Sequence, residues 1–372
     1  MATIKDVAER AGISTTLVSR YLNGQKGVSE SSKKKIMEAI RELNYRPNGI
    51  ARSLVLQKTH SIGIVLDNLC APFAARLIRG LEQGAGAFDK DNNYNVLYCS
   101  SNGDMQKKKE QVQFLTQGRV DGIIIYGSLL SDDAIISQLA SSAFPFLLIE
   151  NDLNGFDVNK VVIDNMEGAY QATEYLIRQG HKRIAHIAGN MNLKITLERL
   201  NGYIRALQDN QIAVDQELIR YPDLSSAGHS IVPVSNCRGD ITYYEAGYEE
   251  MKRMLNKEIL PDALFFATDI SAFGAIKALE EAGIKVPEDV SVIGFDDEAP
   301  GDYGSTCRPI TTMRQPLQEA GYIGIKTLIH SIQYPEFPKE RVVLKTELIV
   351  RDSCNPQFDT LDNTAGKKQN LK

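Results

Sequence analysis

The 372-residue sequence has no tryptophan and only five cysteines, which are scattered along the chain: Cys70, Cys99, Cys237, Cys307 and Cys354. Their odd number and irregular spacing fit neither a disulfide framework nor a metal site, so we expect a reducing cytoplasm and no metal. No apolar run is long enough to span a bilayer, and the polar start MATIKDVAER is unlike a secretory signal. The sequence therefore predicts a cytoplasmic protein that does not enter a membrane.

Motifs for catalysis are also missing. The chain contains neither GxxxxGK[ST] nor GxSxG, and Gly84-Ala85-Gly86 falls inside an expected helix rather than after a strand. His181 and His186 flank or occupy an expected strand and are interpreted as structural. We therefore expect no enzymatic activity and no cofactor.

Charge is unevenly distributed along the chain. The net charge is −5, yet residues 1–60 contain 11 Lys and Arg against 5 Asp and Glu, a net of +6 that leaves −11 on the rest. A basic first segment on an acidic body suits phosphate binding, although a basic surface can also simply be solvated.

Residues 3–45 show the pattern of three short helices. Thr3, with Asp6 in capping-box spacing, begins the first, Gly12 ends it, Ser14 begins the second, and Ser29 begins a third that ends before Pro47. Two helices joined by a glycine turn indicate a helix-turn-helix, in which the second helix exposes Thr16, Ser19, Arg20 and Asn23. A three-helix bundle that binds protein is the alternative.

From residue 61 short apolar runs alternate with segments of helical length. The runs SIGIVL, YNVLYC, DGIIIYG, FPFLLIE, RIAHIAG, ALFFAT and DVSVIGF lack period-two alternation, as is typical of strands buried on both faces. This alternation predicts doubly wound parallel sheets in two subdomains. Residues 356–372 are polar, and we expect a disordered tail.

The segments TIKDVAERAGIS, LVSRYLNG, ELNYRPN and ARSL resemble the lactose-repressor (LacI) family of bacterial regulators, and the likeness continues from SIGIVL to TELIVRDS. The resemblance implies a helix-turn-helix domain at 1–46, a hinge helix at 47–60 and an effector-binding, dimerising body at 61–355. The body would be an α/β periplasmic-binding-protein-like pair joined by three crossovers. Its N-subdomain is expected at about 61–162 plus 297–315, and its C-subdomain at about 163–296 plus 316–355.

The resemblance also implies how DNA is bound. Thr15 and Thr16 would open the recognition helix, and Arg20 would read bases from its middle. Backbone phosphates would be held by Ser19, Asn23 and the start of the first helix at Thr3, and Ser14 is a further expected DNA-binding residue. Leu17 departs from the family, which usually has a small polar residue there. In the hinge, Asn48 would cap a helix that carries Ala51, Arg52 and Leu54, with Leu54 as an apolar wedge in the minor groove. A plain linker is the alternative; paired hinges would require a homodimer and a pseudo-palindromic operator.

For the body the resemblance implies an effector site at the carboxyl ends of the strands. Arg199 and Asp296 are the expected main contacts, because guanidinium and carboxylate groups form paired hydrogen bonds with hydroxyl-rich ligands. Further expected contacts are Phe73, which could stack on a ring, Glu150 and Thr268. Asp269 and Asp296 could instead cap helices, and we favour the cap for Asp269. Residues 221–238 resemble an insertion and are interpreted as a surface loop.

The expected function is a sequence-specific DNA-binding repressor controlled by a small polar effector, with a sugar or sugar derivative favoured. A protein partner or a purine-type corepressor is the alternative. A solute-binding protein and a sugar-metabolising enzyme are more distant possibilities, which the DNA-reading segment and the missing catalytic motifs speak against.

Overall fold

The computed structural model describes residues 2–22, 24–46, 58–87, 93–127, 129–152, 155–224, 241–300 and 309–355. The chain forms two compact units, Met1–Thr59 and His60–Lys372, which we call the head and the body. Asn23, Asn48, Ala51, Arg52 and Leu54 lie outside the described residues, as do most of the 221–238 segment and the tail from 356. Within the described ranges, no helix combines the length and apolarity that crossing a membrane requires.

The head contains α1 (Ile4–Ala11), α2 (Thr15–Leu22) and α3 (Glu30–Glu42). Thr3 and Asp6 form the expected capping box on α1, and Gly12 closes that helix in the left-handed conformation at φ 65°. The three helices pack around a small apolar core that includes Val7, Val18 and Ile36. Three helices with one shared core place α2 on the surface, as a helix-turn-helix requires.

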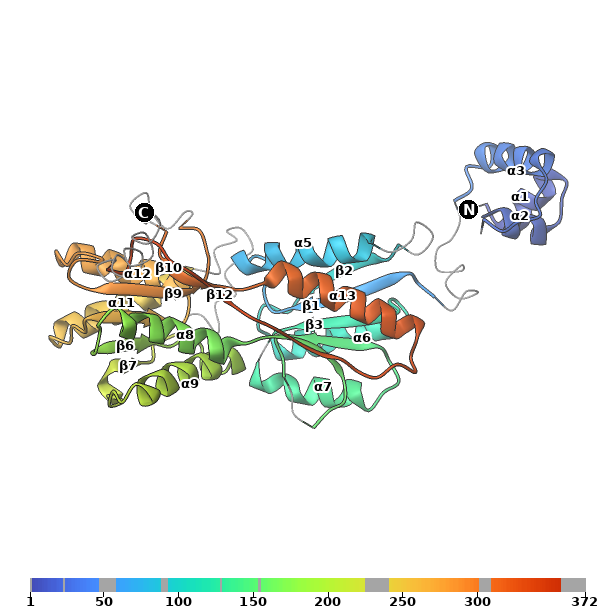
Figure 1. The fold of residues 1–372 in the computed structure, drawn as a ribbon. Helices are drawn as coiled ribbons and strands as arrows, with labels where there is room; N and C mark the ends of the chain where they lie inside the picture. The colour runs from blue at the N-terminus through green and yellow to red at the C-terminus, as the bar shows by residue number, and fades with distance from the viewer. Residues whose placement is uncertain are drawn as a thin grey trace, which may run out of the picture. The chain divides into compact units, whose positions relative to one another are not determined.

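The body holds two six-stranded sheets (Figure 1). The first has the order β11-β5-β4-β3-β1-β2, all parallel. Its strands are β1 (Ser61–Leu66), β2 (Asn95–Ser100), β3 (Gly122–Tyr126), β4 (Phe146–Ile149), β5 (Asn159–Ile163) and β11 (Arg341–Leu344). Helices α5 (Pro72–Gly86) and α13 (Leu317–Gln333) pack on one face, and α6 (Met105–Thr116) and α7 (Asp133–Ala140) pack on the other. Apolar side chains on both faces explain why β1, β3 and β4 lack period-two alternation.

The second sheet has the order β12-β10-β9-β8-β6-β7 and is parallel except for β12. Its strands are β6 (Ile184–Ile187), β7 (Ile219–Arg220), β8 (Ala263–Phe266), β9 (Ser291–Asp296), β10 (Thr311–Arg314) and β12 (Glu347–Ile349). Helices α8 (Asn165–Arg178) and α9 (Lys194–Asp209) cover one face, and α11 (Ile241–Asn256) and α12 (Asp269–Glu281) cover the other. The two doubly wound sheets agree with the predicted fold class.

The chain crosses between the sheets three times, at residues 163–165, 314–317 and 344–347. The expected assignment of 297–315 to the N-subdomain is therefore wrong, as is that of most of 316–355 to the C-subdomain. Residues 311–314 pair with β9 and belong to the second sheet, whereas 317–344 return to the first, where α13 packs on α5 and β11 pairs with β5. The N-subdomain is thus 61–163 plus 317–344, and the C-subdomain is 165–314 plus 347–355.

Glycines allow the late helix α13 to pack closely on α5. A Cβ at Gly80 would lie 1.9 Å from the Gln318 carbonyl oxygen, and one at Gly321 would lie 2.4 Å from the Leu77 carbonyl oxygen. Because real side chains cannot approach that closely, glycine is required at both positions for this helix spacing. The contact holds together two segments that are more than 200 residues apart in the sequence.

Candidate functional site

The exposed face of α2 in the head carries the residues predicted to meet DNA. Ser14 caps the helix, since its hydroxyl oxygen accepts the Leu17 N–H at 3.2 Å, and Val18 points into the core with no exposed surface. Thr15, Thr16 and Arg20 are exposed and Ser19 is half-buried, while Thr3 is exposed at the start of α1. Leu17, the departure from the family pattern, is half-buried against the head core. The surface of α2 therefore offers hydroxyl and guanidinium groups, which suit base edges and phosphates.

In the body, Arg199 of α9 and Asp296 at the end of β9, the two expected main effector contacts, form an ion pair. The Nη1 of Arg199 lies 3.3 Å from Oδ1 of Asp296 and donates to the Ala267 carbonyl at 2.5 Å. Its Nε donates to Oδ1 of Asn165 at 3.0 Å, and its guanidinium stacks 3.8 Å from the centre of the Phe295 ring. Arg199 is buried, so these contacts fix it rigidly rather than leaving it to solvent.

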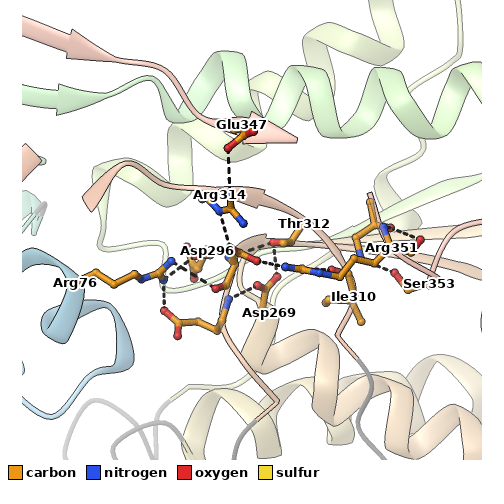
Figure 2. A network of polar contacts seen from close by, with 12 residues as sticks. Arg76, Asp269, Asp296, Ile310, Thr312, Arg314, Glu347, Arg351 and Ser353 are labelled. Carbon is orange, nitrogen blue, oxygen red and sulfur yellow. Dashed lines mark hydrogen bonds and ion pairs between the residues drawn. The ribbon is translucent and has the colours of Figure 1, made fainter. Parts of the chain in front are cut away.

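Asp296 also receives hydrogen bonds from residues that approach from the N-subdomain side. Arg76 of α5 donates to the Asp296 carbonyl at 2.7 Å and pairs with Glu298 at 2.5 Å (Figure 2). Gln315, at the second crossover, donates to Oδ1 of Asp296 at 2.6 Å. Burial raises the pKa of Asp296, and the nearby Arg199 opposes that effect. Asp296 is therefore a junction between the two subdomains.

The backbone is strained where the strands end. Glu150 has φ 65°, Asp296 has φ 112° and Asp297 has φ 56°, a region that side chains other than glycine rarely occupy. Strained residues concentrate at functional sites, where the surrounding contacts hold them in place. The positions of these three at the ends of β4 and β9 mark the same edge of each sheet as the candidate site.

Glu150 is buried and accepts the Ile163 N–H at 2.8 Å and the Asn165 Nδ2 at 3.2 Å. Burial raises the pKa of its carboxyl group, and these two donors oppose the rise. Asn165 thus links Glu150 of the N-subdomain to Arg199 of the C-subdomain, because its Oδ1 accepts from the guanidinium. The first crossover therefore connects the predicted site residues directly.

Two aromatic rings stand beside these charges. The Phe73 ring near the start of α5 lies 5.3 Å from the Tyr126 ring at the end of β3, with 31° between their planes. Burial raises the pKa of Tyr126 well above its usual value, and the carboxylates of Glu150 and Asp296 add to the rise. Tyr126 was not predicted, although its position at a strand's carboxyl end was the available signal.

Thr268, and not Asp269, caps α12. Thr268 is the N-cap of α12, where its hydroxyl oxygen accepts the Ser271 N–H, and it still has a proton to donate. The predicted cap role of Asp269 is wrong, because its buried carboxyl group accepts from Thr312 Oγ1 at 2.7 Å and from the Glu298 N–H at 2.8 Å (Figure 2). Burial raises the pKa of Asp269 well above its usual value. Asp269 thus supports the loop that follows Asp296.

Sequence reasoning missed a buried ionic cluster at the ends of β1 and β3. Lys108 of α6 is 1% exposed and its Nζ lies 2.9 Å from Asp67 Oδ1 and 2.7 Å from Asp132 Oδ1. Just before Asp132, Leu129 pairs with Leu193 of the C-subdomain. Lys108 therefore anchors a loop that touches the opposite subdomain.

A second contact joins the subdomains near that loop. Lys194 of α9 donates to Asp133 and to Oδ1 of Asn151, both at 3.1 Å.

Across the described part of the chain, no group of three or more His, Cys, Asp or Glu side chains could hold a metal ion. The candidate site is therefore built from ion pairs, amides and aromatic rings.

Comparisons with known proteins agree with both parts of this architecture. The model of the bacterial regulatory proteins of the lacI family matches residues 3–48, and that of the periplasmic binding protein-like domain matches residues 173–354. The regulator RegA of Clostridium saccharobutylicum is 35% identical, and the repressor PurR of Haemophilus influenzae strain PittEE is 33% identical. Each alignment covers 95% of this chain and at least 98% of the relative.

Solved structures give the same result. The lac repressor dimer bound to operator and the anti-inducer ONPF superposes with a TM-score of 0.78 at 27% identity, covering 95% of this chain and 98% of that one. The helix-turn-helix head and the two-sheet body define a DNA-binding transcription regulator rather than an enzyme. The chain belongs to the LacI family and is a repressor of that family.

Proposed function

We propose that operator binding by this repressor is controlled by a small hydroxyl-rich effector, of the sugar class, that binds between the two subdomains. Arg199 and Asp296 would form its main polar contacts, Phe73 would stack on its ring, and Glu150 and Thr268 would complete the site. The observation that carries the proposal is the ion pair between Arg199 and Asp296, with 3.3 Å between Nη1 and Oδ1. Arg76 of the other subdomain donates a hydrogen bond to the backbone carbonyl of the same Asp296. A ligand that binds this pair acts on both subdomains at once.

Two solved relatives support a sugar. The regulator CelR in complex with cellobiose has a TM-score of 0.66 at 28% identity, and a LacI family regulator of Enterococcus faecium with bound ribose has a TM-score of 0.63 at 28% identity. A planar purine-type corepressor is the second candidate. The paired rings of Phe73 and Tyr126 would suit a flat ligand, and several relatives carry the name PurR.

For DNA binding we propose a helix-turn-helix domain at 1–46 and a hinge at 47–60, as the sequence predicts. Thr15, Thr16 and Arg20 would read base edges. Phosphates would be held by Thr3, Ser14, Ser19 and Asn23, and the hinge would act through Asn48, Ala51, Arg52 and Leu54. The support in the head is the exposure of Thr15, Thr16 and Arg20 on a helix held from below by Val18. A homodimer would place two heads on a pseudo-palindromic operator, and its place of action would be the cytoplasm.

Control would come from a difference in effector affinity between two arrangements of the subdomains. The first strand begins at Ser61, directly after the proposed hinge, so a shift of the N-subdomains in a dimer would move the end of each hinge near residue 60. An isolated helix of this length is marginal in water and would form only with support. A coupling of about 1–3 kcal/mol between the two sites would be enough to change operator affinity five-fold or more.

The test compares wild-type protein with Arg199→Lys, which keeps the charge but loses the fork of donors. Thermal unfolding and operator binding are measured with ribose, cellobiose and adenine. A bound effector raises the unfolding midpoint of the wild type and changes its operator affinity. Arg199→Lys should lose both responses, while the exposed substitution Arg178→Lys on α8 should keep them. The same response in Arg199→Lys as in the wild type, or no response to any probe, would contradict the proposal.

A further inference from the structure

We propose that the effector site selects uncharged molecules and rejects phosphorylated ones. This inference rests on the proposed function and specifies the chemical class of effector for the same site. Two observations support the inference. Carboxylates gather between the two subdomains, and two buried amide groups there each have an atom without a hydrogen-bond partner among the described residues.

Carboxylates gather at this place. Asp296 lies close enough to Glu150 to raise its pKa, and Glu150 raises the pKa of Glu198 in the same way. Glu198 is half-buried, next to Arg199 in α9, and its carboxylate has no hydrogen bond or ion pair to another described residue. Burial and the carboxylate of Glu150 raise the pKa of Glu198 to about 7. A phosphate group brought here would meet like charges in a setting of low dielectric.

Basic side chains of the described residues around this site already have partners. Arg199 binds Asn165, the Ala267 carbonyl and Asp296, and Arg76 binds Glu298 and two carbonyl groups. The ammonium groups are engaged as well. Lys108 is sealed between Asp67 and Asp132, and Lys194 binds Asp133 and Asn151. Each of these cations is already paired with a carboxylate, and an anionic effector would compete with that internal charge.

Neutral polar atoms, in contrast, remain unused. The side chain of Asn151 is completely buried, and its Nδ2 donor has no hydrogen-bond partner among the described residues. Gln315 is buried as well, and no group in the described part of the chain donates to its Oε1 acceptor. Both amides are fixed by site residues, since Lys194 donates to Asn151 Oδ1 and Gln315 donates to Asp296. A buried donor and a buried acceptor without partners suit a ligand that carries hydroxyl groups but no net charge.

The experiment compares each neutral probe with its phosphate ester on the full-length protein. Ribose is paired with ribose 5-phosphate, glucose with glucose 6-phosphate, and adenosine with its 5′-monophosphate. Calorimetric titration at about pH 8 keeps Glu198 ionised in the free protein. In any pair that binds, the neutral member should bind at least about tenfold more tightly, a difference of roughly 1.4 kcal/mol.

Removing one carboxylate should narrow that preference. Glu198→Gln should bring the phosphate ester closer to the neutral probe, whereas Glu280→Gln, the same change at an exposed position of α12, should leave the ratio unaltered. A phosphate ester that binds as well as its neutral partner overturns this inference and leaves the proposed function intact. If no member of any pair binds at millimolar concentration, the effector proposal itself fails, and this inference fails with it.

Discussion

Replacement of Lys108 by methionine should destabilise the body strongly. Its ammonium group lies within 2.9 Å of three carboxylate oxygens, two on Asp132 and one on Asp67, and both Lys108 and Asp132 are 1% exposed. Methionine fills a similar volume but leaves Asp132 as an uncompensated buried charge. Breaking a buried pair in this way costs about 3–5 kcal/mol. The free energy of unfolding is measured by urea titration followed by circular dichroism at pH 7.

The adjacent substitution Lys107→Met is the control, because Lys107 is exposed on the same helix. It should change stability by less than about 0.5 kcal/mol. Burial already raises the pKa of Asp132, and loss of Lys108 raises it further. The deficit of Lys108→Met should therefore shrink as the pH falls and Asp132 takes up a proton in the folded state. A loss below about 1 kcal/mol, or a deficit that grows on acidification, would refute the reasoning.

Two further outcomes are expected. Arg20→Ala should lose about 1–3 kcal/mol of discrimination between operator and scrambled DNA in gel shifts at fixed salt, and an unchanged specificity ratio would remove Arg20 from the base contacts. His186 stacks between Tyr203 and Phe265, and burial lowers its pKa to about 3. Between pH 6.5 and 3 the imidazole of His186 is protonated in the unfolded chain but neutral in the folded chain. The free energy of unfolding is therefore highest above pH 6.5 and decreases as the pH is lowered through this range. From pH 7 to pH 5 wild type should therefore lose about 2 kcal/mol more than His186→Phe in urea titrations, and equal losses would show that His186 does not control the effect.

Much of the fold could be predicted from local patterns. Runs such as Ile123-Ile124-Ile125 are apolar at successive positions because both faces of the sheet are covered. Thr3 and Asp6 mark the start of a helix through hydrogen bonds between residues three positions apart. Such signals depend on residues that are close together in the sequence. The subdomain boundaries depend on pairing between distant strands, because residues 311–314 belong to the second sheet only through their pairing with β9.

The candidate site shows the same division. Arg199 and Asp296 were predicted from the family resemblance, and their pairing is present in the structure. Lys108 was missed because it stands in the run Lys107-Lys108-Lys109, which has the composition of a solvated helix face. One of these three lysines points inward and meets two carboxylates, and helical geometry alone does not tell which. Tyr126 was missed because a tyrosine that ends an apolar strand also suits a purely structural role.

The packing of α13 on α5 has a consequence for how the protein is made. The N-subdomain receives its last helix and its edge strand β11 from residues 317–344, after the whole C-subdomain sequence up to 314 has been synthesised. Until then the apolar faces of Leu77 and Leu81 on α5 have no α13 to cover them. The two halves of the body therefore cannot mature in the order in which they leave the ribosome. A nascent chain stalled before residue 317 carries an uncovered sheet, which makes the late stage of synthesis the period when the protein most needs protection from aggregation.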